Sequence, residues 1–224
     1  MRIATILILA LLLTAVGLAN LYSVSHGWTS RMDRQLMALA LGVGVLIAIQ
    51  LIDINLLTKL AALSYLFGLL TLLVIPLGGG KEAYGAVRWI NIGNFQFQPS
   101  EFAKIFLILT LAVVFKSKSR SLLRFSLGLA LLTAYSLLVY IQPDLGTSLV
   151  MLAIFLVMVY FSEIPLRYLG ILFLIAILIA PFGWFALRDY QRARLLVFIN
   201  PELEPEGIGY NLNQALIALG SGGG

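Results

Sequence analysis

Residues 81–104 read KEAYGAVRWINIGNFQFQPSEFAK and place Arg88, Glu101 and Lys104 between two long apolar runs. Apolar runs of about 18 or more residues recur along the chain, and such runs are typical of transmembrane helices. Charged side chains at the edge of a bilayer are costly to desolvate, so they usually mark a working site. The stretch therefore indicates both a membrane fold and the place to look for function.

The composition agrees with a membrane protein. The chain has 224 residues, of which 61% are hydrophobic and 11% charged, and its mean hydropathy is +1.00. A soluble domain has roughly 25% charged residues. The net charge of +5 does not point to nucleic acid, because the basic residues sit in short loops where the inside-positive rule explains them. There is no cysteine, which excludes disulfides and thiolate metal sites.

The apolar segments predict an all-α, polytopic integral membrane bundle. Each span should be helical, because lipid offers the backbone no hydrogen-bond partner. We expect a bundle over residues 1–187 and an extracytoplasmic segment over 188–224, with short surface helices at 190–199 and 210–219. The seven predicted spans are 3–22, 36–52, 58–77, 100–115, 125–141, 146–162 and 168–187.

The predicted orientation depends on one loop. Residues 116–124 read KSKSRSLLR, with four cations and no anion, so we expect this loop and the N-terminus in the cytoplasm. Residues 23–35, 78–98 and everything after 187 then face outward. The first span is either an uncleaved anchor or a signal peptide, because Gly17-Leu18-Ala19 resembles a cleavage site.

The segment Gln98-Pro99-Ser100-Glu101 predicts a helix start. Proline suits the first turn because its missing N–H needs no partner there, and an acid in that turn meets the positive end of the helix dipole. Lys104 follows three residues after Glu101, so the two side chains share a face and can pair. The pair either lets two charges survive at the membrane edge or serves a site. We favour the site, since a structural position would more cheaply be apolar.

Further basic residues lie outside the predicted spans. Arg88 can bind phosphate through a bidentate fork, whereas Trp89 is explained as well by an anchor at the lipid headgroups. Three arginines open the tail against the inside-positive bias, namely Arg188, Arg192 and Arg194. They can contact either lipid headgroups or a pyrophosphate substrate.

The sequence Gln142-Pro143-Asp144-Leu145-Gly146-Thr147 joins two predicted spans at the outer face. Asp144 either caps the next helix in a tight turn or belongs to the site. The single histidine, His26, is assigned no role. A metal site made of protein ligands alone is not expected, although carboxylates and a pyrophosphate together could hold Mg²⁺ or Mn²⁺.

Several of these segments together resemble the SEDS family of bacterial cell-wall polymerases (shape, elongation, division and sporulation). The chain resembles the rod-shape branch more than the division branch, because its first predicted span begins close to the N-terminus. Asn211 and Ala215 depart from the family pattern. The matching pieces are Gly85–Ile90, Gln98–Lys104, Gln142–Thr147, Tyr190-Gln191, Arg194, Asn200-Pro201, Gly207–Tyr210, Gln214 and Gly220–Gly223.

The resemblance implies a fold of ten spans, with a catalytic aspartate beyond Gly224, so we expect the natural protein to continue and this portion alone to be inactive. Glu101, Lys104 and Asp144 would then support a general base that lies outside these residues. The expected substrate-binding residues are Arg88, Trp89, Gln98, Ser100, Gln191, Arg192 and Arg194.

The implied activity is a peptidoglycan glycosyltransferase of the bacterial cytoplasmic membrane. It would polymerise lipid II on the outer face during elongation, beside a class B penicillin-binding protein. Two other functions stay open: a transporter that flips the lipid-linked precursor outward, and a scaffold for the crosslinking enzyme without chemistry of its own. A flippase predicts polar groups on both faces, whereas the polar motifs here gather on the outer side.

Overall fold

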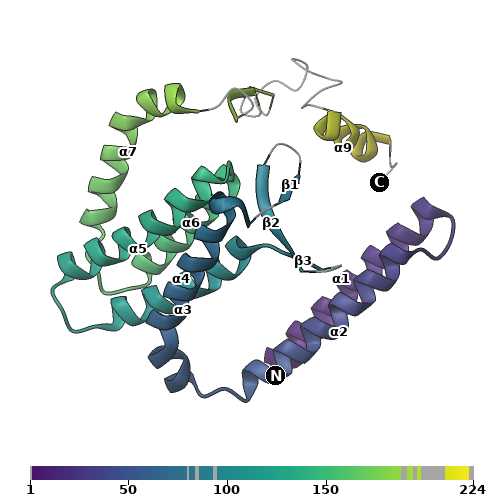
Figure 1. Cartoon of the computed structure of the whole chain (residues 1–224), viewed down its shortest axis with the longest axis horizontal. Helices are drawn as coiled ribbons and strands as arrows, with labels where there is room; N and C mark the ends of the chain where they lie inside the picture. The colour runs from purple at the N-terminus through teal and green to yellow at the C-terminus, as the bar shows by residue number, and fades with distance from the viewer. Residues whose placement is uncertain are drawn as a thin grey trace. The chain divides into compact units, whose positions relative to one another are not determined.

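The computed structural model describes residues 2–79, 81–83, 86–92, 95–187, 191–193, 196–197 and 210–221. Long helices dominate this part of the chain (Figure 1). They are α1 (Arg2–Ser25), α2 (Ser30–Gln50), α3 (Ile54–Val74), α4 (Pro99–Lys116), α5 (Ser121–Ile141), α6 (Leu145–Tyr160), α7 (Arg167–Ala186) and α9 (Tyr210–Ser221).

The helices confirm the predicted fold class, since each predicted span overlaps one of α1 to α7. Within the described residues, four helical segments are long and apolar enough to cross a membrane: Ala4–Ser25, Ser30–Gln50, Ile54–Leu77 and Ser121–Ile141. The apolar stretches of α6 and α7 within the described residues are shorter than these four segments, and α4 carries charged residues near both ends. The chain is thus a polytopic helical membrane protein. Crossing by α4, α6 and α7 stays a prediction, as does a domain boundary at 187.

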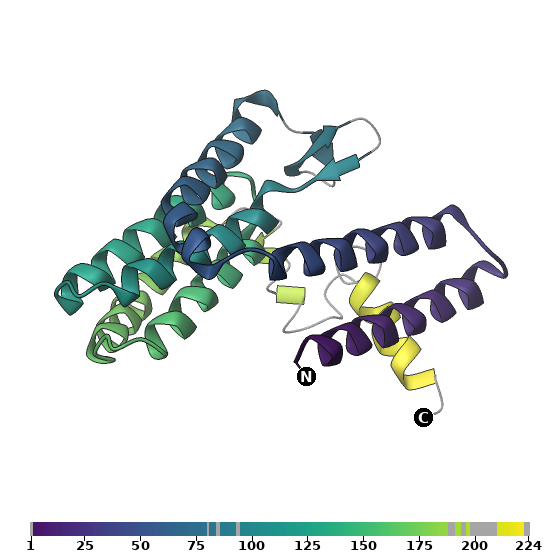
Figure 2. The same ribbon diagram turned by 90° about the horizontal axis from the view of Figure 1, so that it is seen from below.

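Residues 1–60 and 61–224 form two compact units. In the first, α1 and α2 make an antiparallel hairpin (Figure 2). At its turn the Trp28 indole Nε1 donates to Asp33 Oδ1 at 2.8 Å. At its other end, Asp53 precedes α3, and hydrogen bonds from the backbone and side chain of Asn55 lower the pKa of its carboxyl.

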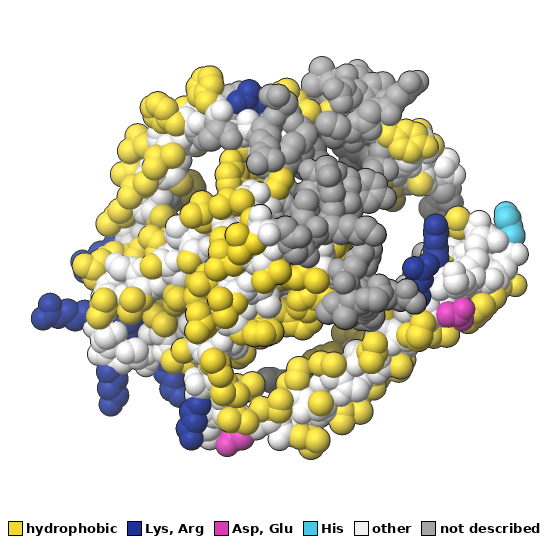
Figure 3. Space-filling model, in the orientation of Figure 1, with side chains coloured by type: hydrophobic (Ala, Val, Ile, Leu, Met, Phe, Trp, Pro, Cys, Tyr) yellow, Lys and Arg dark blue, Asp and Glu magenta, His cyan; other side chains and the backbone are white. Residues whose placement is uncertain are grey.

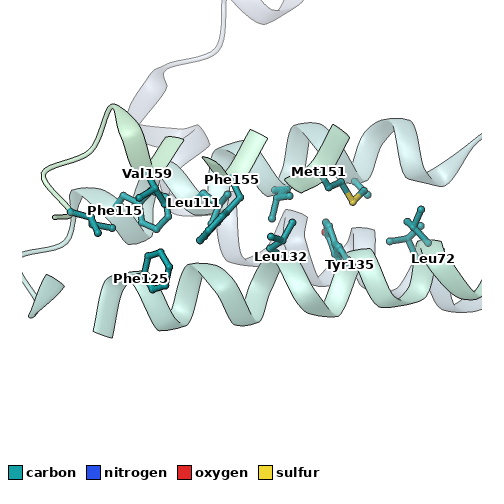
Figure 4. Packing of buried hydrophobic residues seen from close by; sticks show 13 residues of the cluster. Leu72, Leu111, Phe115, Phe125, Leu132, Tyr135, Met151, Phe155 and Val159 are labelled. Carbon is teal, nitrogen blue, oxygen red and sulfur yellow. The ribbon is translucent and has the colours of Figure 1, made fainter. Parts of the chain in front are cut away.

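The second unit is built around α4, α5 and α6, which pack against one another. Figure 4 shows the apolar side chains between them, many fully buried. The phenyl ring of Phe155 on α6 contacts the rings of Phe115 and Phe125, with centroids 6.1 and 5.7 Å away. These aromatic contacts close one end of the bundle.

Helix α3 joins this bundle through paired tyrosines. The rings of Tyr65 and Tyr135 stack with centroids 4.2 Å apart. Tyr135 Oη donates to the Tyr65 carbonyl at 2.7 Å, and Tyr65 Oη donates to the Leu131 carbonyl at 2.8 Å. Each hydroxyl therefore satisfies a backbone carbonyl inside the apolar interior, where an unpaired polar group would be costly.

Between α3 and α4 the chain forms a π-helical turn, η1 (Ile75–Gly79), and a small antiparallel sheet in the order β1-β2-β3. Its strands are β1 (Lys81–Ala83), β2 (Ala86–Ile92) and β3 (Phe95–Phe97). Residues 78–98 are predicted above as an outward-facing segment, and the three strands within it are an addition from the structure. The signal was present, because β2 is rich in β-branched and aromatic residues and Gly93-Asn94 is typical of a two-residue hairpin connection.

Candidate functional site

The start of α4 is built as its sequence predicts. Gln98 is the N-cap residue with an extended backbone, and Pro99 occupies the first turn. The Glu101 N–H donates to the Gln98 carbonyl at 3.2 Å. Ser100 is only 2% exposed, so this turn is anchored in the protein rather than frayed into solvent. The anchored turn holds the two charged residues that follow it.

Glu101 and Lys104 form an ion pair, with Nζ and Oε1 2.7 Å apart. The Glu101 side chain is 54% exposed and that of Lys104 22% exposed. An exposed pair of this kind contributes only about 0–1 kcal/mol to stability. The fold gains little from it, so the pair is free to serve a ligand.

Asp144 is the N-cap of α6. Its Oδ1 accepts from the Thr147 N–H at 3.2 Å and its Oδ2 from the Thr147 hydroxyl at 2.9 Å. Asp144 is 7% exposed, so the carboxylate sits at the positive end of a helix with little water around it. The structure therefore confirms the interpretation of this motif as a turn in which Asp144 caps the next helix.

Gln142 lies in the same motif as Asp144 and makes a tertiary contact that was not predicted from the sequence. It ends α5, is 4% exposed, and donates from Nε2 to the Leu72 carbonyl on α3 at 2.9 Å. The bond joins residues 70 positions apart in the chain. Pro76 is a sequence signal for such a contact, because a proline in a helix leaves the carbonyl four residues earlier, here that of Leu72, without its helical donor.

The first turns of α4 and α6 lie at the same end of the bundle. Helices α4 and α6 run in the same direction, because α5 returns between them. Figure 4 places Phe115, Phe125 and Val159 at one end and Tyr135, Met151 and Leu72 toward the other. The first turns of α4 and α6, with Glu101, Lys104 and Asp144, thus share the end at which α3 leaves the bundle.

Strand β2 carries Arg88 and Trp89, and it packs against both η1 and α4. Lys81 pairs with Trp89 but Glu82 pairs with Val87, so Arg88 is the extra residue of a β-bulge. Bulges re-aim side chains and are frequent beside active sites. Trp89 is partly exposed, whereas the side chain of Arg88 lies outside the described residues.

The predicted tail residues are only partly described. Gln191 is 6% exposed, and residues 191–193 and 196–197 are helical. Arg192 Nη2 donates to the Phe185 carbonyl at 2.9 Å, near the end of α7. This is a favourable place for a cation, since the last carbonyls of a helix lack partners. Arg188 and Arg194 fall outside the described residues.

Two apolar cavities adjoin α5. One, of about 710 Å³, lies between α5 and α7 and is lined by Phe125, Leu129 and Ile171 among others. The other, of about 400 Å³, lies between α5 and α6 and reaches Leu145, the residue after Asp144. Both are lined by Leu129 and Thr133, so together they form an apolar groove along α5.

Basic side chains are prominent at the opposite end of the bundle, where α4 and α5 are joined (Figure 3). Lys116, Lys118 and Arg120 are all exposed there. Across the ranges given above, no group of three or more His, Asp or Glu residues is placed to hold a metal ion.

The fold and the site define a polytopic membrane protein with polar motifs gathered at one end of its bundle. Residues 3–224 match the family model for FtsW, RodA and SpoVE, described as cell cycle protein. The chain belongs to this family, which confirms the resemblance to the SEDS proteins.

Three relatives illustrate the match. The peptidoglycan glycosyltransferase MrdB of Escherichia coli K12 is 32% identical over 98% of this chain and 60% of its own length. A solved peptidoglycan synthase complex that coordinates polymerization and crosslinking matches with TM-score 0.80 and 34% identity, over 94% of this chain and 63% of that one. The rod shape determining protein RodA of Thermus thermophilus matches with TM-score 0.65 and 33% identity, over 76% and 57%. The chain spans about three fifths of the length of these relatives.

Proposed function

We propose that the full-length protein is a peptidoglycan glycosyltransferase that polymerises lipid II into glycan strands during cell elongation. Its similarity to a protein named for that activity supports this, and similarity to a rod shape determining protein supports the role in elongation. The observation that carries the proposal is structural. An ion pair and a helix-capping carboxylate share one end of a bundle that also has an apolar groove.

The reaction joins a sugar carried on a polyprenyl pyrophosphate to the 4-hydroxyl of another lipid-linked disaccharide. It needs a base for that hydroxyl, positive charge for the departing pyrophosphate, and an apolar path for the lipid tails. The base is expected beyond residue 224. The residues of the candidate site would supply the positive charge and the apolar path.

Positive charge would come from Lys104 and from the arginines of β2 and the tail, with Glu101 and Asp144 shaping the local field. Trp89, Gln98, Ser100 and Gln191 would line the substrate. Removing one cation that contacts the leaving group should lower the rate by about 10²–10³, as for a lost oxyanion donor. Loss of a mere headgroup contact should cost about 1 kcal/mol of membrane affinity and little activity.

The groove along α5 suits a polyprenyl tail, because its lining is almost entirely apolar and it reaches the cap of α6. Any divalent cation, Mg²⁺ or Mn²⁺, would draw its ligands in part from the pyrophosphate itself. The polymer would be crosslinked by a partner of the class B penicillin-binding type. The related synthase complex, which coordinates polymerization and crosslinking, supports such a partnership.

The proposed location is the bacterial cytoplasmic membrane, with residues 116–124 inside and the polar end of the bundle outside. Because the chain has no cysteine, single-cysteine labelling can test this directly. We expect Ser119→Cys to resist a membrane-impermeant maleimide in spheroplasts and Ser25→Cys to react. Labelling of Ser119→Cys, with Ser25→Cys protected, would reverse the orientation and remove the proposed function.

The direct test is purified full-length protein with lipid II. We expect glycan strands, detected by gel electrophoresis, that are sensitive to a muramidase. The alternative function, a flippase, predicts lipid II crossing the bilayer of proteoliposomes without polymer. A scaffold predicts neither activity but retained binding of the crosslinking enzyme, so the three readouts separate the three functions.

A further inference from the structure

We propose that Gln142 is a positioning residue, which holds the exit of α3, and with it the strand bearing Arg88, in fixed register with the Asp144 cap of α6. This inference rests on the proposed function for its catalytic consequence. Its structural part stands on the hydrogen bond between Gln142 and Leu72.

The carbonyl of Leu72 lacks its usual main-chain donor. In an α-helix the N–H of each residue donates to the carbonyl four residues earlier. The residue four positions after Leu72 is Pro76, which has no N–H. Leu72 is 0% exposed, so its carbonyl is out of reach of bulk water. A buried carbonyl in that position needs a donor from elsewhere in the fold.

The side chain of Gln142 supplies a donor to the Leu72 carbonyl. Gln142 Nε2 lies 2.9 Å from the Leu72 oxygen, within ordinary hydrogen-bond distance. Gln142 is itself 4% exposed and sits where α5 ends, so its backbone is fixed by the α5–α6 turn. The side-chain amide thus takes the place of the main-chain donor that Pro76 lacks.

The Gln142–Leu72 bond lies between two segments of the candidate site. On the α3 side, the helix widens into the π-turn η1, which begins at Ile75 and includes Pro76, and η1 packs against β2, which carries Arg88. Short π-helical segments are frequent at functional sites. On the α5 side, Asp144 follows two residues later and caps α6. One buried bond therefore connects the two segments that carry the site's candidate cation and its capping carboxylate.

The test exploits the proline. In Pro76→Ala the main chain regains its own donor for Leu72, so Gln142 should become dispensable. The full-length protein is compared as Gln142→Leu, Pro76→Ala and the double variant. Gln50→Leu is the matched control, because Gln50 Nε2 also donates to a carbonyl, that of Leu46 at 3.1 Å, but within one exposed helical turn.

Two readouts are needed. The first is the kcat and KM for lipid II, and the second is hydrogen exchange of residues 81–97 by mass spectrometry. We expect Gln142→Leu to lower kcat about tenfold with a smaller change in KM, and to speed exchange by a similar factor. The double variant should return to within about threefold of Pro76→Ala in both readouts. Gln50→Leu should match the wild type.

The rescue separates positioning from general stability. If the double variant is as impaired as Gln142→Leu, or if Gln142→Leu changes neither readout, the inference is overturned. Should Gln142→Leu fail to fold, recovery of folded protein in the double variant supports the inference and failure to recover overturns it. If the wild type makes no polymer, the proposed function fails, while hydrogen exchange still decides the role of Gln142.

Discussion

At the end of the bundle where α6 begins, Gln142 and Asp144 are buried and bonded to neighbouring segments. At the opposite end, Lys116, Lys118 and Arg120 are exposed, and Arg124 is held through its Nη1, which donates to the Phe115 carbonyl at 2.8 Å. Exposed cations cost little and can set orientation. Buried polar groups must be held by partners. The basic end thus carries exposed charge, whereas the end where α6 begins carries buried polar groups that are held by hydrogen bonds.

The largest expected difference between the ends is catalytic. We expect Glu101→Ala and Lys104→Ala each to lower lipid II polymerisation by the full-length protein about 100-fold or more, since the pair lies at the polar end and contributes little to stability. Lys118→Ala, which removes an exposed cation at the other end, should keep activity within about twofold. Initial rates with purified, monodisperse protein provide the measurement. Wild-type turnover by either of the first two variants would remove the ion pair from the mechanism.

A smaller difference is expected in packing. A Cβ added at Gly68 would collide with the Tyr135 hydroxyl, which is held in place by its bond to Tyr65 and by the ring stack. At Gly128 the added Cβ would lie 2.6 Å from the ring of Phe115, which is near the end of α4. Overpacking costs about 1–3 kcal/mol where neighbours cannot move.

We therefore expect Gly68→Ala to destabilise the full-length protein by an amount in that range and Gly128→Ala by less. Thermal unfolding of the two variants in the same detergent measures the difference. A larger loss for Gly128→Ala would contradict this expectation and show that the basic end is the more rigid one.

Much of the fold was predictable, because the apolar segments are long and their physics is simple. The charged start of α4 and the Asp144 cap also followed from local rules about helix ends, which depend on residues within one turn. The rod-like helices and their order along the chain needed no knowledge of tertiary contacts.

What escaped prediction depends on contacts distant in sequence or on short elements. The small sheet of residues 81–97 was missed because its strands are short and its alternation is brief. The Gln142 bond was missed because its partner is 70 residues away, and nothing local to Gln142 points to Leu72. The role of Arg88 as a site residue stays a prediction, and its place in a bulge depends on strand register, which the sequence alone does not specify.

The smallest difference between the two ends concerns the helix caps. The cap of α6 is Asp144, whose carboxylate accepts two bonds from Thr147, whereas the N-cap of α5 is Arg120, which makes no side-chain cap bond. Losing a carboxylate cap costs about 0.5–2 kcal/mol. We expect a loss of that size for Asp144→Ala and less than about 0.5 kcal/mol for Arg120→Ala, measured by denaturant unfolding.

Asp144→Asn then separates the cap from the charge, because asparagine is an equally good cap residue. If Asp144→Asn keeps the wild-type free energy of unfolding yet loses polymerisation, the negative charge itself acts in the reaction. If Asp144→Asn keeps both the wild-type stability and polymerisation, the Asp144 side chain serves only as the cap of α6. Equal losses of stability for Asp144→Ala and Arg120→Ala would contradict the contrast between the caps, because the exposed end would then depend on its cap as much as the buried one.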